Sequence, residues 1–102
     1  MVLTNTLLGM VIDVNTRKPV LGAGRGGLSG AAMHPVAVRA VYDVHEALPH
    51  LPIVGVGGTT SGADVVEFLL AGASAVEVGT ATFADPRAPR RILKEFEKWC
   101  ER

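Results

Sequence analysis

The stretches Ile53-Val54-Gly55-Val56-Gly57-Gly58 and Ala75-Val76-Glu77-Val78-Gly79-Thr80 decide the fold of this chain. Each starts with a strand-like run that is mostly apolar and β-branched, and each ends in a turn of small residues. A pair of such turns points backbone N–H groups at one spot, which is how a protein holds phosphate without a lysine. The sequence therefore predicts two strands, at 53–56 and 75–78, with a phosphate site at their ends.

A helix is predicted before the first of these strands and another between the two. In the first helix, apolar residues recur at helical spacing between two prolines; they are Ala37, Val41, Val44 and Leu48, between Pro35 and Pro49. The second helix has the signature of a capping box at its start and a C-cap glycine at its end. Its predicted cap residues are Ser61, Asp64 and Gly72, and its predicted buried stripe is Val65, Phe68 and Leu69.

The segments at the two ends of the chain complete the pattern. Val2-Leu3-Thr4 is predicted to be a short strand, and residues 11–21 an excursion hairpin outside the core, with its tip at 15–18. Residues 22–30 are too glycine-rich for a helix or a stable strand, and we expect a loop. Asp85-Pro86 is predicted to open a last helix whose apolar face is formed by Ile92, Leu93, Phe96, Trp99 and Cys100.

This order of elements predicts an α/β fold with parallel strands and right-handed crossovers, in one unit over residues 1–102. Three such βα units make neither a full doubly wound sheet nor a closed eight-stranded barrel, which takes roughly 250 residues. The chain looks incomplete on this pattern. An isolated parallel sheet of this size leaves apolar faces and edges uncovered, so we expect self-association or packing against further sequence.

Composition excludes several classes of function. Of the 102 residues, 48% are hydrophobic and 20% charged, and the formal net charge is zero. No polybasic face is available for nucleic acid or anionic lipid. No apolar run reaches the ~20 residues that a membrane-spanning helix needs. The single Cys100 makes neither an internal disulfide nor a cysteine metal site, which suits a reducing cytoplasm.

Two glycine patterns compete as phosphate sites. Gly22, Gly24 and Gly27 have the G-x-G-x-x-G spacing of a dinucleotide fold, but no strand leads directly into them, and the acidic residue that should follow, Asp43, falls within a predicted helix. A flexible loop explains them better. The second pattern, Gly57-Gly58 with Gly79-Thr80, follows two consecutive strands, as in the phosphate sites that many barrels build after strands 7 and 8. Glycines that merely turn a strand into a helix would explain either turn alone, but the pair favours phosphate.

The chain resembles the C-terminal part of dihydroorotate dehydrogenase, most closely the class 1B catalytic subunit. The resemblance runs through essentially the whole chain in order and spacing. The segments that carry it are Asn5-Thr6, Thr16-Arg17-Lys18-Pro19, Gly26-Gly27-Leu28-Ser29-Gly30, Pro35-Val36-Ala37, Gly55-Val56-Gly57-Gly58, Glu67-Phe68-Leu69-Leu70-Ala71-Gly72-Ala73 and Val76-Glu77-Val78-Gly79-Thr80-Ala81. That family folds as an FMN-containing (β/α)8 TIM barrel, so the resemblance implies that this chain supplies strands 6 to 8 with their helices.

Site residues are implied position by position. Asn5 and Thr6 resemble the pair that hydrogen-bonds the ring and carboxylate of orotate or dihydroorotate, and an amide with a hydroxyl suits such a ligand. Thr4 matches a position that touches FMN, where an aliphatic residue is commoner. Gly30 resembles the glycine that closely approaches FMN, although Ala31 stands where the family often has proline. The FMN phosphate is implied to bind at the glycine cradle, the name used here for Gly57, Gly58, Gly79 and Thr80.

The implied reaction is oxidation of dihydroorotate to orotate in pyrimidine biosynthesis, in which FMN accepts a hydride. The family's base, a Cys or Ser on a loop after an earlier strand, is not in this chain, and neither is its lysine near the flavin. The chain alone should therefore be inactive and lacks a catalytic residue. Class 1B subunits pair with an iron–sulfur, FAD-containing subunit, which is a further implied partner.

The remaining nucleophiles and histidines are predicted to be structural. Cys100 reads as a buried small residue, and Ser29 and Ser61 as loop and cap residues. The three histidines, His34, His45 and His50, lack metal-ligand spacing and an acidic partner, and we place them at helix ends and on the surface.

Other interpretations stay open from the sequence. The chain could be a stand-alone partial barrel that binds phosphate-bearing ligands without redox chemistry. It could also be part of the related dihydropyrimidine dehydrogenase, although the Gly-Leu-Ser-Gly loop and the Thr-Arg-Lys-Pro hairpin favour the dihydroorotate enzyme.

Overall fold

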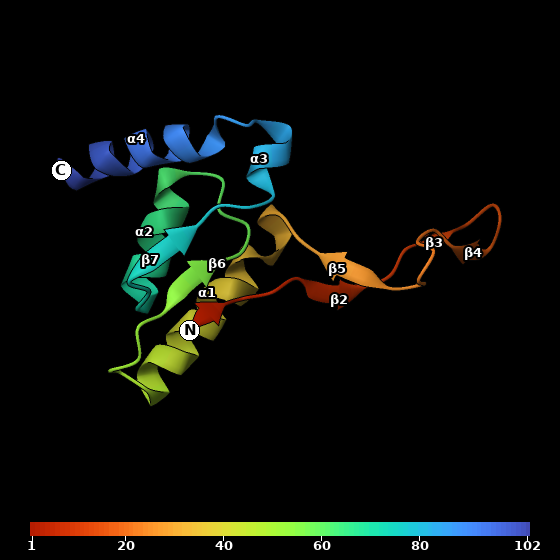
Figure 1. Ribbon diagram of the computed structural model, residues 1–102, viewed down its shortest axis with the longest axis horizontal. Helices are drawn as coiled ribbons and strands as arrows, with labels where there is room; N and C mark the ends of the chain where they lie inside the picture. Colours follow the sequence, from red (N-terminus) through yellow and green to blue (C-terminus); the bar gives the residue numbers. More distant parts are fainter.

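A three-stranded parallel sheet in the order β1-β6-β7 is the centre of the structure, a computed structural model that describes all 102 residues (Figure 1). Its strands are β1 (Val2–Leu3), β6 (Val54–Val56) and β7 (Ala75–Glu77). In register, Val2 pairs with Val54, and Val54 in turn pairs with Ala75. The predicted strands and their parallel direction are confirmed.

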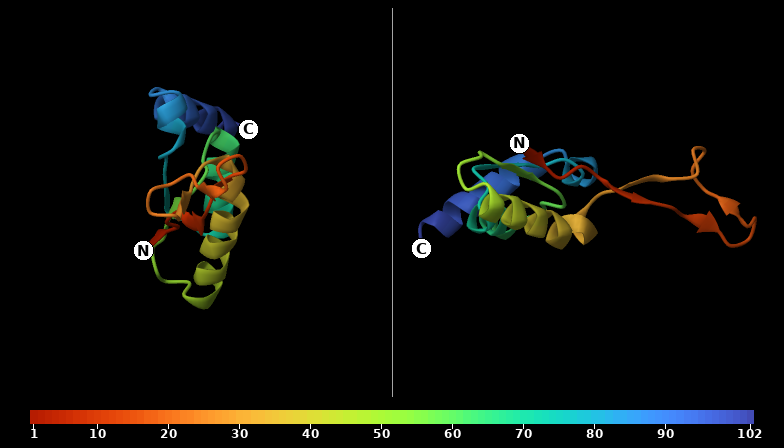
Figure 2. Two further views of the ribbon diagram at one scale, coloured as in Figure 1. Left: turned by 90° about the vertical axis from the view of Figure 1, so that its right-hand side faces the viewer. Right: turned by 90° about the horizontal axis from the view of Figure 1, so that it is seen from below.

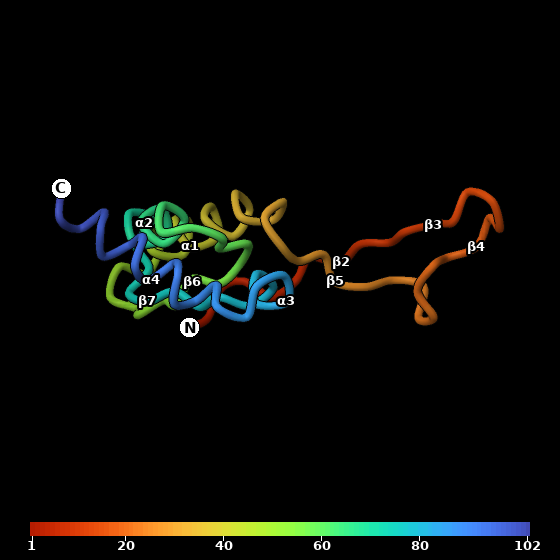
Figure 3. The backbone as a smooth tube through the Cα atoms, turned by 90° about the horizontal axis from the view of Figure 1, so that it is seen from above, coloured from red at the N-terminus to blue at the C-terminus, as the bar shows by residue number.

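The helices α1 (His34–Ala47) and α2 (Gly62–Ala71) lie together on one side of the sheet (Figure 3). A short 3₁₀ turn, η1 (Ala31–Met33), leads into α1. Alternation along β6 explains the layering, because Ile53 and Gly55 are buried while Val54 and Val56 are half-buried. The core consists of Met33, Ala37, Val41, Ile53, Phe68, Ala71 and Ala73.

Gly55 lets the sheet and α2 come close together. A Cβ atom at this position would lie 2.6 Å from Cδ1 of Phe68, which is fully buried. A larger residue at position 55 would therefore push α2 off the sheet.

Both caps of α2 were predicted correctly. The Ser61 side chain accepts a hydrogen bond from the Asp64 N–H, the Asp64 carboxylate accepts one from the Ser61 N–H, and Gly72 ends the helix at a φ of 120°. The predicted buried stripe was only partly right, since Val66 and Phe68 are buried whereas Val65 and Leu69 are half-buried.

In α1, Ala37 and Val41 are buried as predicted, but Leu48 is not part of the buried face. It is 52% exposed at the position that follows the helix. The helix ends one residue earlier than the apolar spacing indicated, so Leu48 lies outside it.

The last helix, α4 (Ala88–Cys100), begins after the predicted Asp85-Pro86 start and is preceded by a short helix, α3 (Ala81–Ala84), that was not predicted. The Asp85 carboxylate instead accepts a hydrogen bond from the Arg87 N–H, 3.0 Å away, in the turn between the helices. Because α4 packs mainly on α2, only Ala88 and Ile92 are buried. Cys100 is exposed, which corrects its prediction as a buried residue.

An extended arm projects from this body, as the right panel of Figure 2 shows. It pairs β2 (Leu7–Gly9) with β5 (Gly26–Leu28) and β3 (Ile12–Asp13) with β4 (Lys18–Pro19), both antiparallel. The predicted hairpin outside the core is confirmed. The prediction that 22–30 is entirely loop was wrong, because Gly26–Leu28 gains a ladder with the unpredicted strand at 7–9.

No helix of this chain combines the length and the apolar character needed to cross a membrane.

Candidate functional site

The loops that follow β1, β6 and β7 leave the sheet at the same edge, because the three strands are parallel. Thr4, just after β1, is tied to the end of β6: its N–H donates to the Val56 carbonyl at 2.7 Å, and its hydroxyl lies 3.4 Å from the same oxygen. The predicted site residues all lie in these loops or, for Gly30, just before η1.

Gly57 and Gly58 are packed against the start of α1 in conformations that favour glycine, with φ of 143° and 65°. A Cβ at Gly57 would lie 2.7 Å from the Ala37 Cβ and 3.5 Å from the Thr4 hydroxyl. At Gly58 it would lie 2.6 Å from the Gly30 carbonyl oxygen. The loop after β6 therefore contacts both the end of β1 and the segment that leads into α1.

Gly30 and Thr80 also meet. Gly30 has a φ of 94°, and a Cβ there would lie 3.8 Å from the Thr80 methyl group. By contrast, a Cβ at Gly79 would meet no atom within 4 Å. The contacts thus link Thr4, Gly57, Gly58, Gly30 and Thr80 in one place, with open space at Gly79.

The backbone of this region offers donors. The carbonyl oxygen of Gly79 accepts hydrogen bonds from the hydroxyl and the N–H of Thr82, at 2.6 and 3.0 Å, while the Thr80 carbonyl accepts from Phe83. The N–H groups of Gly58, Gly79 and Thr80 donate no hydrogen bond within the chain. Free N–H groups next to engaged carbonyls are the kind of donors that an anion needs.

Asn5 and Thr6 are exposed and lie where the arm begins. The Asn5 side-chain oxygen accepts a hydrogen bond from the Thr6 N–H at 2.7 Å, and the Thr6 side chain contacts Gly27. No hydrogen bond within the chain joins either side chain to the glycine cradle. The Thr6 hydroxyl lies 3.5 Å from the same Asn5 oxygen, so the Asn5 amide NH₂ is the group of this pair without a partner in the chain.

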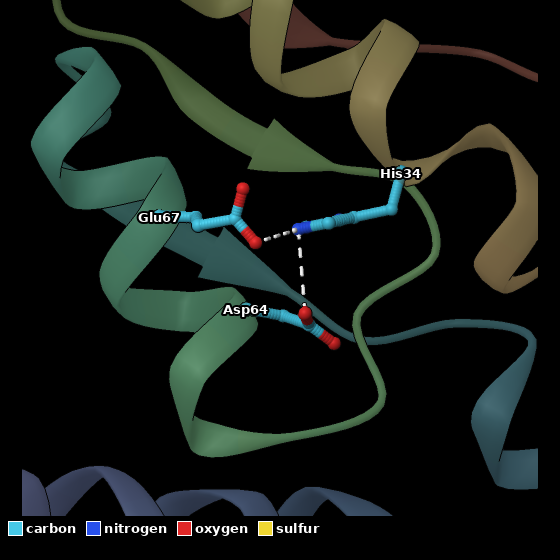
Figure 4. A group of neighbouring side chains, drawn as sticks. All are labelled: His34, Asp64 and Glu67. Carbon is cyan, nitrogen blue, oxygen red and sulfur yellow. Dashed lines mark ion pairs between the residues drawn. The ribbon is translucent and has the colours of Figure 1, made fainter.

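His34 is a functional candidate that the sequence reasoning missed. His34 is the first residue of α1, as predicted for a residue at a helix end. Contrary to the prediction, it is only 6% exposed and has acidic residues beside it. Its Nδ1 lies 2.7 Å from the Gly57 carbonyl oxygen, and its Nε2 lies 3.6 Å from both the Asp64 and the Glu67 carboxylates (Figure 4). Its ring meets Phe68 edge-on, with centroids 4.9 Å apart.

The Asp64 carboxylate is held in its charged form. Burial acts to raise its pKa, but hydrogen bonds from the Thr60 N–H and hydroxyl, the charge of the nearby His34 and the Ser61 side chain outweigh burial and lower the pKa. The only signal of this cluster in the sequence was the three-residue spacing of Asp64 and Glu67 on one helix, and nothing local pairs them with residue 34.

The other histidines and nucleophiles agree better with expectation. His50 is exposed beyond the end of α1, and His45 is half-buried beside Gly72. Ser61 is the helix cap that was predicted, and Ser29 is an exposed residue just after β5.

Residues 1–99 match the family model for dihydroorotate dehydrogenase. A Solibacter usitatus protein provisionally named dihydroorotate dehydrogenase A (fumarate) is 56% identical over 98% of this chain and 33% of its own length. The dihydroorotate dehydrogenase B (NAD(+)) catalytic subunit of Desulforamulus reducens is 57% identical over 93% of this chain and 31% of its own length. The subunit of the same name from Pelobacter propionicus is 54% identical over 97% of this chain and 32% of its own length. The chain thus spans about a third of the length of the curated relatives it matches.

Proposed function

We propose, on the premise that this chain belongs to the dihydroorotate dehydrogenase family, that it forms the FMN phosphate side and part of the substrate side of an enzyme that oxidises dihydroorotate to orotate. The observation that carries the proposal is the convergence of Thr4, Gly30, the loop at 57–58 and Thr80 at one edge of a parallel sheet. Edges of this kind, at the carboxyl ends of strands, are where α/β enzymes bind their ligands.

FMN is the cofactor that the glycine cradle fits. The free N–H groups of Gly58, Gly79 and Thr80 would hold its phosphate, and the open space at Gly79 leaves room for that group. Thr4 and Gly30 adjoin the cradle and would contact the rest of the cofactor. When bound, FMN supplies the hydride-accepting chemistry of the reaction.

Asn5 and Thr6 would bind the substrate. The side-chain amide and hydroxyl are exposed at the same edge of the sheet, one residue beyond Thr4. Together they offer donors and acceptors to the ring and carboxylate of dihydroorotate.

The three parallel strands with α1, α2 and α4 would correspond to the last three βα units of a TIM barrel. The half-buried Val54 and Val56 on the face away from the helices support this, because in a closed barrel that face is filled by side chains from the other strands. The catalytic base would come from those other strands, so these 102 residues would be inactive alone. An iron–sulfur, FAD-containing subunit would be the electron-transfer partner, and the enzyme would work in the cytoplasm.

We also propose that the enzyme is of class 1B. Relatives named as type A and as type B both match at more than half identity, and most of those described here are type B catalytic subunits. The acceptor of the electrons is therefore proposed to be NAD, through the partner subunit.

An FMN titration of the purified chain, followed by flavin fluorescence, tests the proposal, with riboflavin as the comparison that lacks phosphate. Binding of FMN but not of riboflavin would support the cradle. Equal binding of both would contradict recognition through phosphate. Binding of FMN together with equally tight binding of unrelated sugar phosphates would favour a general phosphate-binding module instead.

A further inference from the structure

His34, Asp64 and Glu67, called here the His34 cluster, come from two helices that are far apart in sequence. His34 is the first residue of α1, and both carboxylates lie on α2, separated by about one helical turn (Figure 4). Their ligand atoms, one imidazole nitrogen and two carboxylate oxygens, all lie within 4.8 Å of one another. The cluster has no part in the flavin and substrate contacts proposed above.

The hydrogen bond made by Nδ1 of His34 determines whether Nε2 carries a proton in the neutral ring. A carbonyl oxygen can only accept, so the Nδ1 of His34, 2.7 Å from the Gly57 oxygen, carries the proton. In the neutral ring, Nε2 then has no proton, and its lone pair points at two carboxylates. Nε2 is buried and has no hydrogen-bond partner. This arrangement requires a positive charge between the three groups.

The distances leave room for a metal ion between the three groups. Nε2 lies 3.6 Å from the Asp64 oxygen and 3.6 Å from the Glu67 oxygen, too far for a hydrogen bond to either. Two ligand atoms bound at about 2.0–2.2 Å to one tetrahedral ion are about 3.4 Å apart. The two separations from Nε2 are therefore close to the edge of such a tetrahedron, and all three ligand atoms lie within 4.8 Å of one another.

The surroundings agree with this chemistry. A histidine that ligates a metal through Nε2 commonly donates its Nδ1–H to a backbone carbonyl, as His34 does to Gly57. Two carboxylates and a neutral imidazole carry a charge that one divalent cation neutralises. The Glu67 side chain is 57% exposed, which gives an ion a path to the site and lets this ligand move to close the coordination.

We propose that the His34 cluster is a binding site for a divalent transition-metal ion such as Zn²⁺, held by His34 Nε2 and by the carboxylates of Asp64 and Glu67. The imidazole selects against Mg²⁺, which prefers oxygen ligands alone. Because Nδ1 of the same ring binds the Gly57 carbonyl, an ion at Nε2 would also brace the loop at 57–58 against α2.

Titration of the purified chain with Zn²⁺, monitored by imidazole ¹⁵N NMR, tests the proposal. We expect one equivalent to move the Nε2 resonance of His34, and an equal concentration of Mg²⁺ to leave it in place. Calorimetry with Glu67→Gln should show affinity at least tenfold weaker. The matched variant Glu97→Gln, which removes an exposed glutamate of α4, should bind within twofold of the unchanged chain.

Three results would overturn the proposal. They are saturation by Zn²⁺ with no movement of the His34 resonance, equal weakening by the two variants, and no Zn²⁺ binding at millimolar concentration. In the last case a protonated His34 would be the cation between the carboxylates. Glu67 is chosen for substitution because it is exposed, so that the variant should fold normally, which its thermal unfolding would confirm.

Discussion

The Nδ1 atom of His34 lies 2.7 Å from the carbonyl oxygen of Gly57, so the first residue of α1 is hydrogen-bonded to the loop that follows β6. The same imidazole packs edge-on against Phe68 of α2. One buried side chain thus joins two helices to the loop that contains half of the glycine cradle. The geometry of that loop should depend on His34 even though this residue is not among those proposed to touch FMN.

Replacing His34 with alanine should destabilise the chain by about 1.5–4.5 kcal/mol. The buried Gly57 carbonyl would lose its partner, at about 1–3 kcal/mol, and the aromatic pair with Phe68 would lose a further 0.5–1.5 kcal/mol. Urea unfolding measures the loss. His50→Ala, at an exposed histidine, should change the free energy of unfolding by less than about 0.5 kcal/mol. Similar values for the two variants would show that the buried hydrogen bond stabilises nothing.

Gly58→Ala should destabilise the chain by at least about 1–2 kcal/mol, the cost of a left-handed conformation for a residue with a Cβ. Its φ is 65°, and the new atom would also meet the Gly30 carbonyl oxygen at 2.6 Å. Gly22→Ala is the matched control, because a Cβ there meets nothing within 4 Å and its φ is not in the restricted range. A stable Gly58→Ala variant would contradict the packing of this loop on Gly30.

The local signals in the sequence predicted the elements of the sheet and helices well. The capping box of Ser61 and Asp64, the glycine at 72 and the strand-to-turn pattern at 53–58 each depend on residues close together in the chain. Such features can be predicted because the residues that form caps and turns are neighbours in the sequence.

The features that the sequence did not predict depend on distant partners. Gly26–Leu28 forms a strand only because residues 7–9 pair with it, and the ladder overrides the low strand propensity of glycine. His34 meets Asp64 and Glu67 across 30 or more positions, which no spacing rule reveals. Cys100 lies on the apolar side of its helix by periodicity, yet it is exposed because α4 has no further element of this chain against that face.

Gly79→Val should weaken FMN binding far more than Ser61→Ala. A side chain at position 79 would fill the open space where the phosphate is proposed to bind, whereas Ser61 only caps α2. Removal of the cap should cost about 1 kcal/mol of stability with little effect on affinity. Flavin fluorescence titrations of the two folded variants make the comparison. Equal losses of affinity would count against the glycine cradle.

Acid should destabilise the chain partly through Asp64. The folded state lowers the pKa of this carboxyl, so its contribution is present above the ordinary aspartate value near 4 and is lost as the pH falls through the lower folded value. Asp64→Asn should therefore be less stable at pH 7 but should lose less stability as the pH falls below about 4. Urea unfolding at a series of pH values tests this. The control Asp43→Asn, at an exposed residue of α1, should keep the acid dependence of the unchanged chain, and parallel curves for all three proteins would refute the assignment.

The purified chain should be a dimer or a larger species by light scattering. An apolar groove between α2, β7 and α4 is open along residues that include Val65, Leu69, Val76, Leu93 and Phe96. The arm adds the exposed side chains of Leu8, Val11 and Val14. Apolar surfaces of this size are seldom exposed to water, and in the proposed barrel other strands and helices would cover part of them.

Leu93→Glu should reduce the average mass if the groove is a contact between copies, whereas Leu70→Glu, at an exposed leucine outside the groove, should not. A monodisperse monomer at high concentration would mean that these faces need no cover, and it would remove one support for packing against further parts of a barrel.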